Sequence, residues 1–175
     1  MRHITAIVFV LWLGVTTGFS QSGVPSTMGP FSLGLQAGIS YSGWNLALVG
    51  SYQYESVSGY LGPSISLNRG LPGTGPIGMT AGVNYHIPSQ KSWLSSLVNL
   101  DYQLNLFHAG SGSTDAIHEL HVSYGLVFHV TEAFYIVQQL GYGMYFESVL
   151  QETTGTRRTF NGYDGLVRLR AGYFF

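Results

Sequence analysis

The sequence has 175 residues, of which 9% are charged, 14% are aromatic and 24 are glycine, and its formal net charge is −1. A typical soluble domain carries about 25% charged residues, so a surface that faces water throughout is a poor fit to this composition. Cysteine is absent and the few basic residues form no extended patch, which excludes disulfides, thiolate metal sites, a cysteine nucleophile and nucleic acid as a partner.

The N-terminal residues are typical of a secretory signal peptide. A short positive start precedes an apolar run over residues 4–15, and Gly18 and Ser20 place small residues where a signal peptidase reads. The run is shorter than the ~20 apolar residues that a membrane-spanning helix needs. The chain is therefore predicted to divide into a signal peptide cleaved after Ser20, an N-terminal lead-in and one barrel domain, at residues 1–20, 21–29 and 30–175.

From residue 31 onward, large apolar residues alternate with small or polar ones over stretches of roughly ten residues, separated by turn-forming clusters. This period of two is typical of β-strands that present two different faces. In the third stretch Pro63 donates no ladder hydrogen bond, so we predict a β-bulge there. The predicted strands lie at residues 31–41, 44–53, 57–68, 77–86, 94–106, 119–130, 134–146 and 164–175.

The alternation fits a soluble barrel with an apolar interior or a transmembrane barrel with an apolar exterior. The small, polar residues on one face suit a narrow lumen, and the bulky apolar residues on the other suit contact with lipid. Aromatic residues near the strand ends fit the girdles of the transmembrane type. One predicted girdle is Tyr41, Trp44, Phe107, Phe146 and Tyr163, and the other is Phe31, Tyr85, Trp93, Phe134 and Phe175.

The last predicted strand alternates to the end of the chain, where Tyr173 precedes a terminal Phe175. This ending is similar to the C-terminal assembly signal of outer-membrane barrels. The chain resembles the small eight-stranded outer-membrane barrels, the family of the OmpA transmembrane domain and OmpX, without the peptidoglycan-binding domain of OmpA. We therefore predict an all-β, eight-stranded, antiparallel, up-and-down transmembrane β-barrel in the bacterial outer membrane. The expected partners are outer-membrane lipid, lipopolysaccharide, the barrel-assembly machinery and an unidentified envelope protein.

The same alternation directs a set of polar and charged side chains into the lumen. Eight strands leave an interior that side chains just fill. Because buried charges need partners, we expect the arginines of this set to bridge its carboxylates and to plug the lumen, which favours a structural or interaction role in the envelope. The predicted lumen network is Asp101, Glu119, His121, Arg168 and Arg170.

With both termini on the periplasmic side, the longest outer loop is predicted at residues 147–160. It carries Glu152, Arg157 and Arg158, which are the natural surface residues for contact with a partner. The alternative is a solvated loop with no partner, because loop sequences vary freely.

The hypothesis that the chain is an enzyme rests on His121 and Ser123. They resemble the His-x-Ser pair of PagL-like lipid A deacylases, with Glu132 as the orienting acid. Parity points both side chains into the lumen, away from lipid, so deacylation is the second hypothesis and a narrow channel or small-ligand carrier is the third. No metal or other cofactor is expected, since His118 and His121 point to opposite faces of one strand.

Overall fold

The computed structural model describes residues 30–67, 77–108, 114–151 and 154–175. The predicted signal peptide and lead-in lie outside the described residues. No helix within the described part of the chain is long and apolar enough to cross a membrane. The eight strands are β1 (Phe31–Ser40), β2 (Gly43–Tyr54), β3 (Val57–Ser66), β4 (Ile77–Ile87), β5 (Leu94–His108), β6 (Thr114–His129), β7 (Phe134–Gln151) and β8 (Thr156–Phe174).

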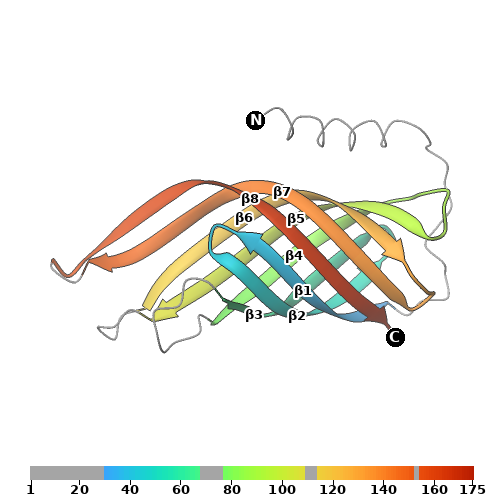
Figure 1. Ribbon diagram of the computed structural model, residues 1–175, viewed down its shortest axis with the longest axis horizontal. Coiled ribbons are helices and arrows are strands. Elements are labelled where there is room, and N and C mark those ends of the chain that lie inside the picture. Colours follow the sequence, from blue (N-terminus) through green and yellow to red (C-terminus); the bar gives the residue numbers. More distant parts are fainter. Residues whose placement is uncertain (1–29, 68–76, 109–113, 152–153) are drawn as a thin grey trace.

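Each strand pairs antiparallel with the next, and β8 pairs with β1 to close the barrel (Figure 1). The predicted eight-stranded, antiparallel, up-and-down architecture is therefore confirmed. The turn between β1 and β2 and the hairpin of β7 and β8 lie at one end, here called the hairpin end. The chain leaves the barrel at the other end, here called the terminal end, where β8 stops at Phe174.

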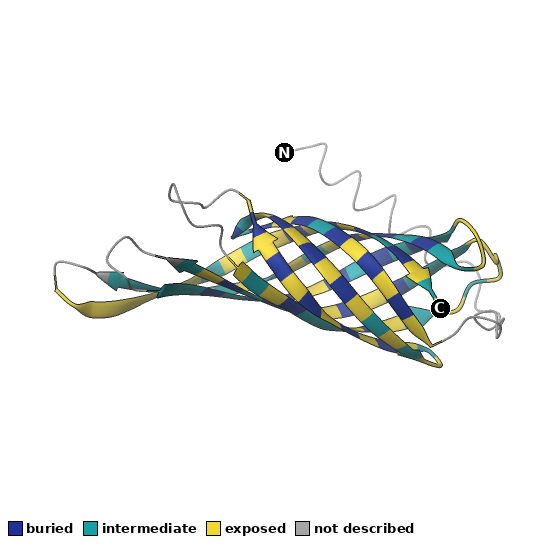
Figure 2. Cartoon of the chain, turned by 90° about the horizontal axis from the view of Figure 1, so that it is seen from below, coloured by how far each residue is buried: buried dark blue, intermediate teal, exposed yellow. Residues whose placement is uncertain are grey.

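Buried and exposed residues alternate along the strands (Figure 2). The exposed residues are the bulky apolar ones: Leu35 on β1 is 68% exposed and Leu48 on β2 is 46% exposed. The buried residues are largely polar, and Asn99 and Asp101 on β5 have no exposed surface at all. A soluble barrel would have the opposite arrangement, so the exterior of this barrel is suited to lipid.

The register passes Pro63 without a bulge, so that prediction was wrong. On the β2 side of the strand, Leu61 pairs with Gly50 and Ser64 pairs with Ala47, which spans three positions on both strands. The side chain of Pro63 faces outward. Because proline has no N–H, the ladder lacks one hydrogen bond there, but the strand contains no extra residue.

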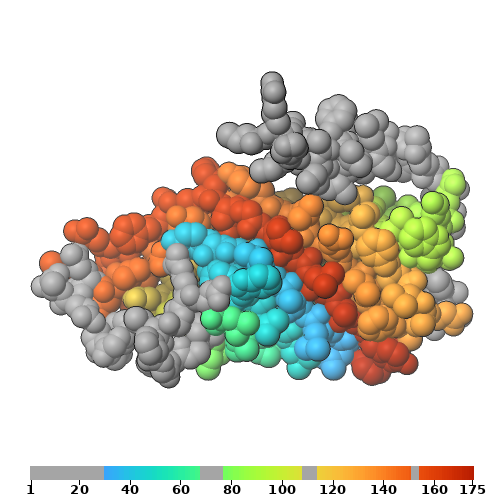
Figure 3. Space-filling view, in the orientation of Figure 1, coloured from blue at the N-terminus to red at the C-terminus, as the bar shows by residue number. Residues whose placement is uncertain are grey.

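The hairpin of β7 and β8 is longer than the sequence predicted. Residues 147–160, expected to form a loop, are mostly strand, because β7 continues to Gln151 and β8 begins at Thr156. In β8, pairing with β1 reaches only Val167, so the preceding part of the strand pairs with β7 alone. The two strands project beyond the rim of the barrel (Figures 1 and 3).

One aromatic residue of the predicted girdles has a different role. Trp44 and Tyr163 are exposed on the outer surface, as expected. Tyr41 is half-buried and stacks on Tyr145 of β7, with ring centroids 3.4 Å apart and ring planes 6° apart. It packs the β1–β2 turn against the hairpin of β7 and β8.

The interior changes in character along the barrel axis. At the terminal end it is mixed: an apolar cluster of Leu97, Val127, Tyr135 and Val137, with Phe174 against it, lies beside the buried polar residues Ser32, Ser58 and Asn84. In the middle it is charged, and near the hairpin end it is polar and acidic. The buried polar residues of the middle and the hairpin end include Gln36, Ser42, Asn45, Asn99, Asp101, Glu119, His121, Arg168 and Arg170.

Candidate functional site

The centre of the lumen holds an ion pair between β5 and β8. Arg168 Nη2 donates to Asp101 Oδ2 at 2.6 Å, and both side chains are almost completely buried. Thr80 Oγ1 also lies within hydrogen-bond distance of Asp101 Oδ1, at 3.4 Å. A charge-assisted bond of this length, in a site that excludes water, fixes β5 to β8 across the interior.

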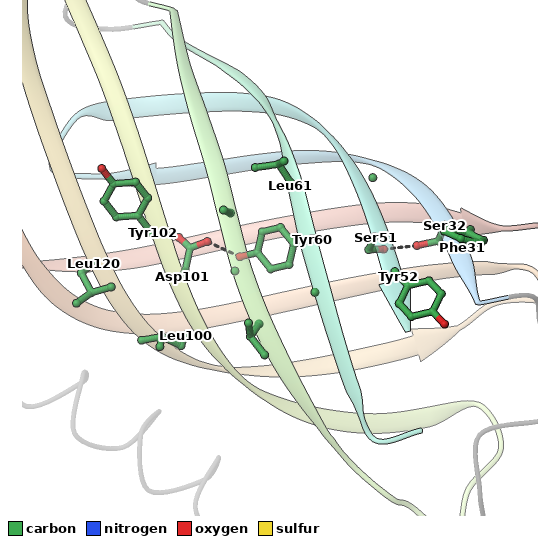
Figure 4. A pocket seen from close by; sticks show the side chains of 15 residues that line it. Phe31, Ser32, Ser51, Tyr52, Tyr60, Leu61, Leu100, Asp101, Tyr102 and Leu120 are labelled. Atoms are coloured by element: carbon green, nitrogen blue, oxygen red, sulfur yellow. Dashed lines mark hydrogen bonds between the residues drawn. The ribbon is translucent and has the colours of Figure 1, made fainter. Parts of the chain in front are cut away.

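Tyr60 of β3 completes this pair, and the sequence analysis missed it. Its hydroxyl donates to Asp101 Oδ1, and Figure 4 shows the two side chains pointing toward one another. Arg168 Nη1 donates to the same hydroxyl at 3.0 Å. The parity of the third predicted strand puts Tyr60 on the inner face with Ser58. The alternation in the sequence could therefore have identified Tyr60 as a lumen residue.

Arg170 does not bridge a carboxylate, contrary to expectation. Its Nε and Nη2 donate to Gln36 Oε1 of β1, at 3.0 and 2.7 Å. Its guanidinium lies 3.9 Å from the centre of the Tyr60 ring, which is a cation–π contact. Gln36 and Tyr60 therefore accommodate this arginine in place of the second predicted ion pair.

Glu119 lies nearer the hairpin end, and none of the arginines that the structure describes pairs with it. The backbone N–H of Ser42, in the β1–β2 turn, donates to Glu119 Oε1 at 2.8 Å. Among the described residues, Glu119 Oε2 is buried without a hydrogen-bond partner. The predicted bridging of two carboxylates by two arginines thus holds for Asp101 and Arg168 only.

His121 lies between two carboxylates. Its Nε2 is 3.1 Å from both carboxylate oxygens of Asp164 on β8, and its Nδ1 is 3.9 Å from Asp101 Oδ2. The alternation placed Asp164 on the inner face of the last predicted strand. Its contact with His121 became visible only with the register of β6, β7 and β8.

The residues of the enzymatic hypothesis do not form a catalytic triad. Ser123 Oγ donates to Asn99 Oδ1 at 3.2 Å, while His121 contacts Asp164. No hydrogen bond within the described part of the chain joins His121 to Ser123. Glu132 lies in the exposed turn between β6 and β7, past the end of the strand. A serine nucleophile needs its base within hydrogen-bond reach, so the arrangement gives that chemistry no support.

The predicted surface-contact residues lie on the projecting hairpin. Arg157 is exposed on β8 and donates to Ser148 Oγ and to the carbonyl of Thr114, at 3.3 and 3.1 Å. Arg158 is also exposed, while Glu152 lies outside the described residues. Both arginines belong to a strand and not to a loop.

The predicted assembly residues lie at the terminal end, on the outer surface. Tyr173 is 51% exposed and Phe175 is 69% exposed, and their ring centroids are 5.5 Å apart. The backbone N–H of Phe175 donates to the carbonyl of Phe31, at 3.0 Å. Both side chains thus face outward, and the end of the chain is held against β1.

The outer wall has a shallow depression of about 730 Å³ across β1 to β6. Gly50 and Gly59 form its floor because neither carries a side chain. Its outward-facing walls are Phe31, Tyr52, Leu61, Val83, Leu100, Tyr102 and Leu120 (Figure 4). An open, apolar hollow of this kind on a barrel wall suits an acyl chain.

The barrel is similar to two solved structures of small outer-membrane barrels. One is the N-terminal β-barrel domain of Pseudomonas aeruginosa OprF, with a TM-score of 0.58, 12% identity and coverage of 83% of this chain and 96% of that domain. The other is Neisserial surface protein A (NspA), with a TM-score of 0.54, 15% identity and coverage of 86% and 100%. No protein-family model and no curated protein matches the sequence.

At these identities the similarity establishes the fold. The chain has the closed eight-stranded architecture of the small outer-membrane β-barrels, as its resemblance to the OmpA transmembrane domain and OmpX predicted.

Proposed function

We propose that this chain spans the bacterial outer membrane and has a structural or interaction role there, with a lumen closed by its own side chains. The observation that carries the proposal is the pairing of Arg168 with Asp101 across the interior of a barrel whose exterior is apolar. A barrel with this distribution of residues is stable in lipid and blocked along its axis.

The membrane location is supported by the exterior. Exposed apolar surface is unfavourable in water by about 25 cal/mol per Å². Every strand of this barrel exposes at least one leucine, isoleucine or valine side chain. Contact with lipid removes that penalty. We propose outer-membrane lipid and lipopolysaccharide as its surroundings, reached by way of a cleaved signal peptide and the barrel-assembly machinery.

The closed lumen distinguishes this role from that of a narrow channel. Eight strands leave little interior space, and Tyr60, Asp101, Arg168 and Arg170 occupy the middle of it. The test is electrical conductance of the refolded protein in a planar lipid bilayer. We expect no conductance above that of the lipid alone. Steady unitary conductance from the monomeric wild-type barrel that changes in Arg168→Ala would favour the channel instead.

The projecting hairpin is the proposed contact surface for an envelope partner. Among the described residues, the part of β8 before Val167 pairs with β7 alone, which leaves one edge of this segment without a paired strand. Arg157 and Arg158 add positive charge to this hairpin, which suits the phosphates of lipopolysaccharide.

The double charge reversal Arg157→Glu with Arg158→Glu tests this contact surface. It should leave folding in phosphatidylcholine vesicles unchanged and should weaken the binding of lipopolysaccharide by the folded barrel. Equal binding of lipopolysaccharide by wild type and variant would remove the hairpin as that surface.

A further inference from the structure

Two consecutive backbone amides of the β1–β2 turn hold two carboxylates, the fully buried Glu119 and the half-buried Asp164. The N–H of Tyr41 donates to Asp164 Oδ2 and the N–H of Ser42 donates to Glu119 Oε1, both at 2.8 Å. Each bond fixes the orientation of a carboxylate while leaving a second oxygen for another interaction. Such bonds from the backbone are what commonly orients carboxylates that bind metals.

His121 lies beside both of these carboxylates. Glu119, His121 and Asp164 each offer a donor atom, and the three atoms lie within 4.8 Å of one another. The separation of His121 Nε2 and Asp164 Oδ1, 3.1 Å, is close to the about 3.4 Å expected between two ligands of a tetrahedral zinc ion. A small shift of the Glu119 side chain would complete the set.

A second observation points to a ligand at this position. Glu119 is fully buried, and its Oε2 accepts no hydrogen bond from any residue that the structure describes. Gln103, its register partner on β5, does not satisfy it, because Gln103 Nε2 also has no partner among those residues. A buried carboxylate oxygen without a hydrogen-bond donor is costly. A bound ligand therefore accounts for this oxygen better than the protein side chains alone do.

The charges at this position also favour a cation. Glu119 and Asp164 together carry two negative charges, and neither forms an ion pair with a described arginine or lysine. Arg168 is engaged by Asp101, and Arg170 is engaged by Gln36 and Tyr60. A divalent cation would neutralise the pair of carboxylates.

We propose that Glu119, His121 and Asp164 bind a divalent first-row transition-metal ion such as Zn²⁺ at the hairpin end of the lumen. One imidazole nitrogen and two carboxylate oxygens form a ligand set that suits zinc, with a water in the fourth position. The ion would join β6 to β8 directly and to the β1–β2 turn through the two amides. It would therefore stabilise the end of the barrel at which the hairpin of β7 and β8 leaves the rim.

The competing explanation is a metal-free site in which His121 Nε2 donates a hydrogen bond to Asp164 and Nδ1 faces Asp101. In that case these contacts hold the imidazole between the two carboxylates and no metal is needed. This arrangement leaves Glu119 Oε2 without a partner, which is why we favour the ion. Direct measurement of metal binding separates the two explanations.

The test uses the full mature chain without a histidine tag, refolded in detergent. Competition with a chromogenic zinc chelator should give one Zn²⁺ per chain. Glu119→Gln, His121→Gln and Asp164→Asn should each weaken this binding by at least about tenfold. His118→Gln is the matched control, since His118 is the neighbouring histidine of β6 but contacts the Tyr102 hydroxyl, and it should bind as wild type does.

A measurement on the wild type alone guards against variants that fail to fold. Zinc X-ray absorption should give only nitrogen and oxygen ligands at about 2.0–2.2 Å, with the scattering signature of one imidazole. Absence of stoichiometric binding by the wild type would overturn the proposal in favour of the metal-free arrangement. Binding that is lost in His118→Gln but kept in the three site variants would also overturn it.

Discussion

Arg168 Nη2 and Asp101 Oδ2 lie 2.6 Å apart inside the barrel, although 67 residues separate them in the chain. The arginine comes from β8 and the aspartate from β5, on different sides of the lumen. Together with Tyr60 of β3 they join three separate parts of the barrel wall at one point.

Arg168→Ala should be strongly destabilising, because it leaves the charge of Asp101 buried without a partner. Breaking a buried pair by removing one member costs about 3–5 kcal/mol. Urea unfolding of the refolded protein in detergent measures the change. Arg157→Ala removes an exposed arginine of the same strand and should change the free energy of unfolding by less than about 0.5 kcal/mol. Equal free energies of unfolding for the two variants would show that the lumen pair stabilises the barrel no more than an exposed arginine does.

Gly82→Ala should be destabilising because Tyr60 lies over this glycine. A Cβ at Gly82 would meet the Tyr60 ring and hydroxyl at 2.5–2.7 Å, and overpacking of this kind costs about 1–3 kcal/mol. Gly59→Ala is the matched control, because it lies on an adjacent strand with nothing within 4 Å of the added carbon. The same unfolding assay checks both, and a Gly82→Ala protein as stable as the control would contradict the position of Tyr60.

Leu48→Arg should be destabilising in lipid vesicles, since Leu48 faces outward from the middle of β2. An arginine on the lipid face near the membrane midplane costs about 2–4 kcal/mol. Phe160→Arg is the control, because Phe160 is equally exposed but lies on the projecting hairpin, outside the proposed membrane span. Its effect should be close to zero. Similar costs at both positions would argue against lipid around the barrel.

The sequence predicted the strands well wherever the two faces of a strand meet different environments. In β5, leucine and valine residues alternate with Asn99, Asp101 and Gln103, and the alternation fixes both the strand and its inner face. The hairpin of β7 and β8 was missed because the two faces of each of its strands are alike: residues 147–150 are all half-buried and residues 156–161 are all exposed. Without two environments there is no alternation, and polar residues such as Thr156 and Arg157 then look like a loop.

The partners of the lumen residues were harder to predict than their inward direction. Parity placed Arg170 and Glu119 in the lumen, and both are buried there. Their contacts depend on the register of distant strands: Arg170 bonds to Gln36, 134 residues away, and Glu119 bonds to the amide of Ser42, 77 residues away. Charge alone predicted two ion pairs, one of which did not form. Instead, an amide oxygen and an aromatic ring bind Arg170, and a backbone N–H binds Glu119.

The most direct test of the central claim, a closed barrel with a lipid-facing exterior, is the folding of the mature chain from Gln21 with and without detergent. In detergent we predict strand-rich far-UV circular dichroism and a difference in gel mobility between boiled and unboiled samples. In plain buffer we predict aggregation, because the exterior is apolar. A monomeric chain that folds in plain buffer, with no mobility difference on boiling, would contradict the account and indicate a soluble barrel.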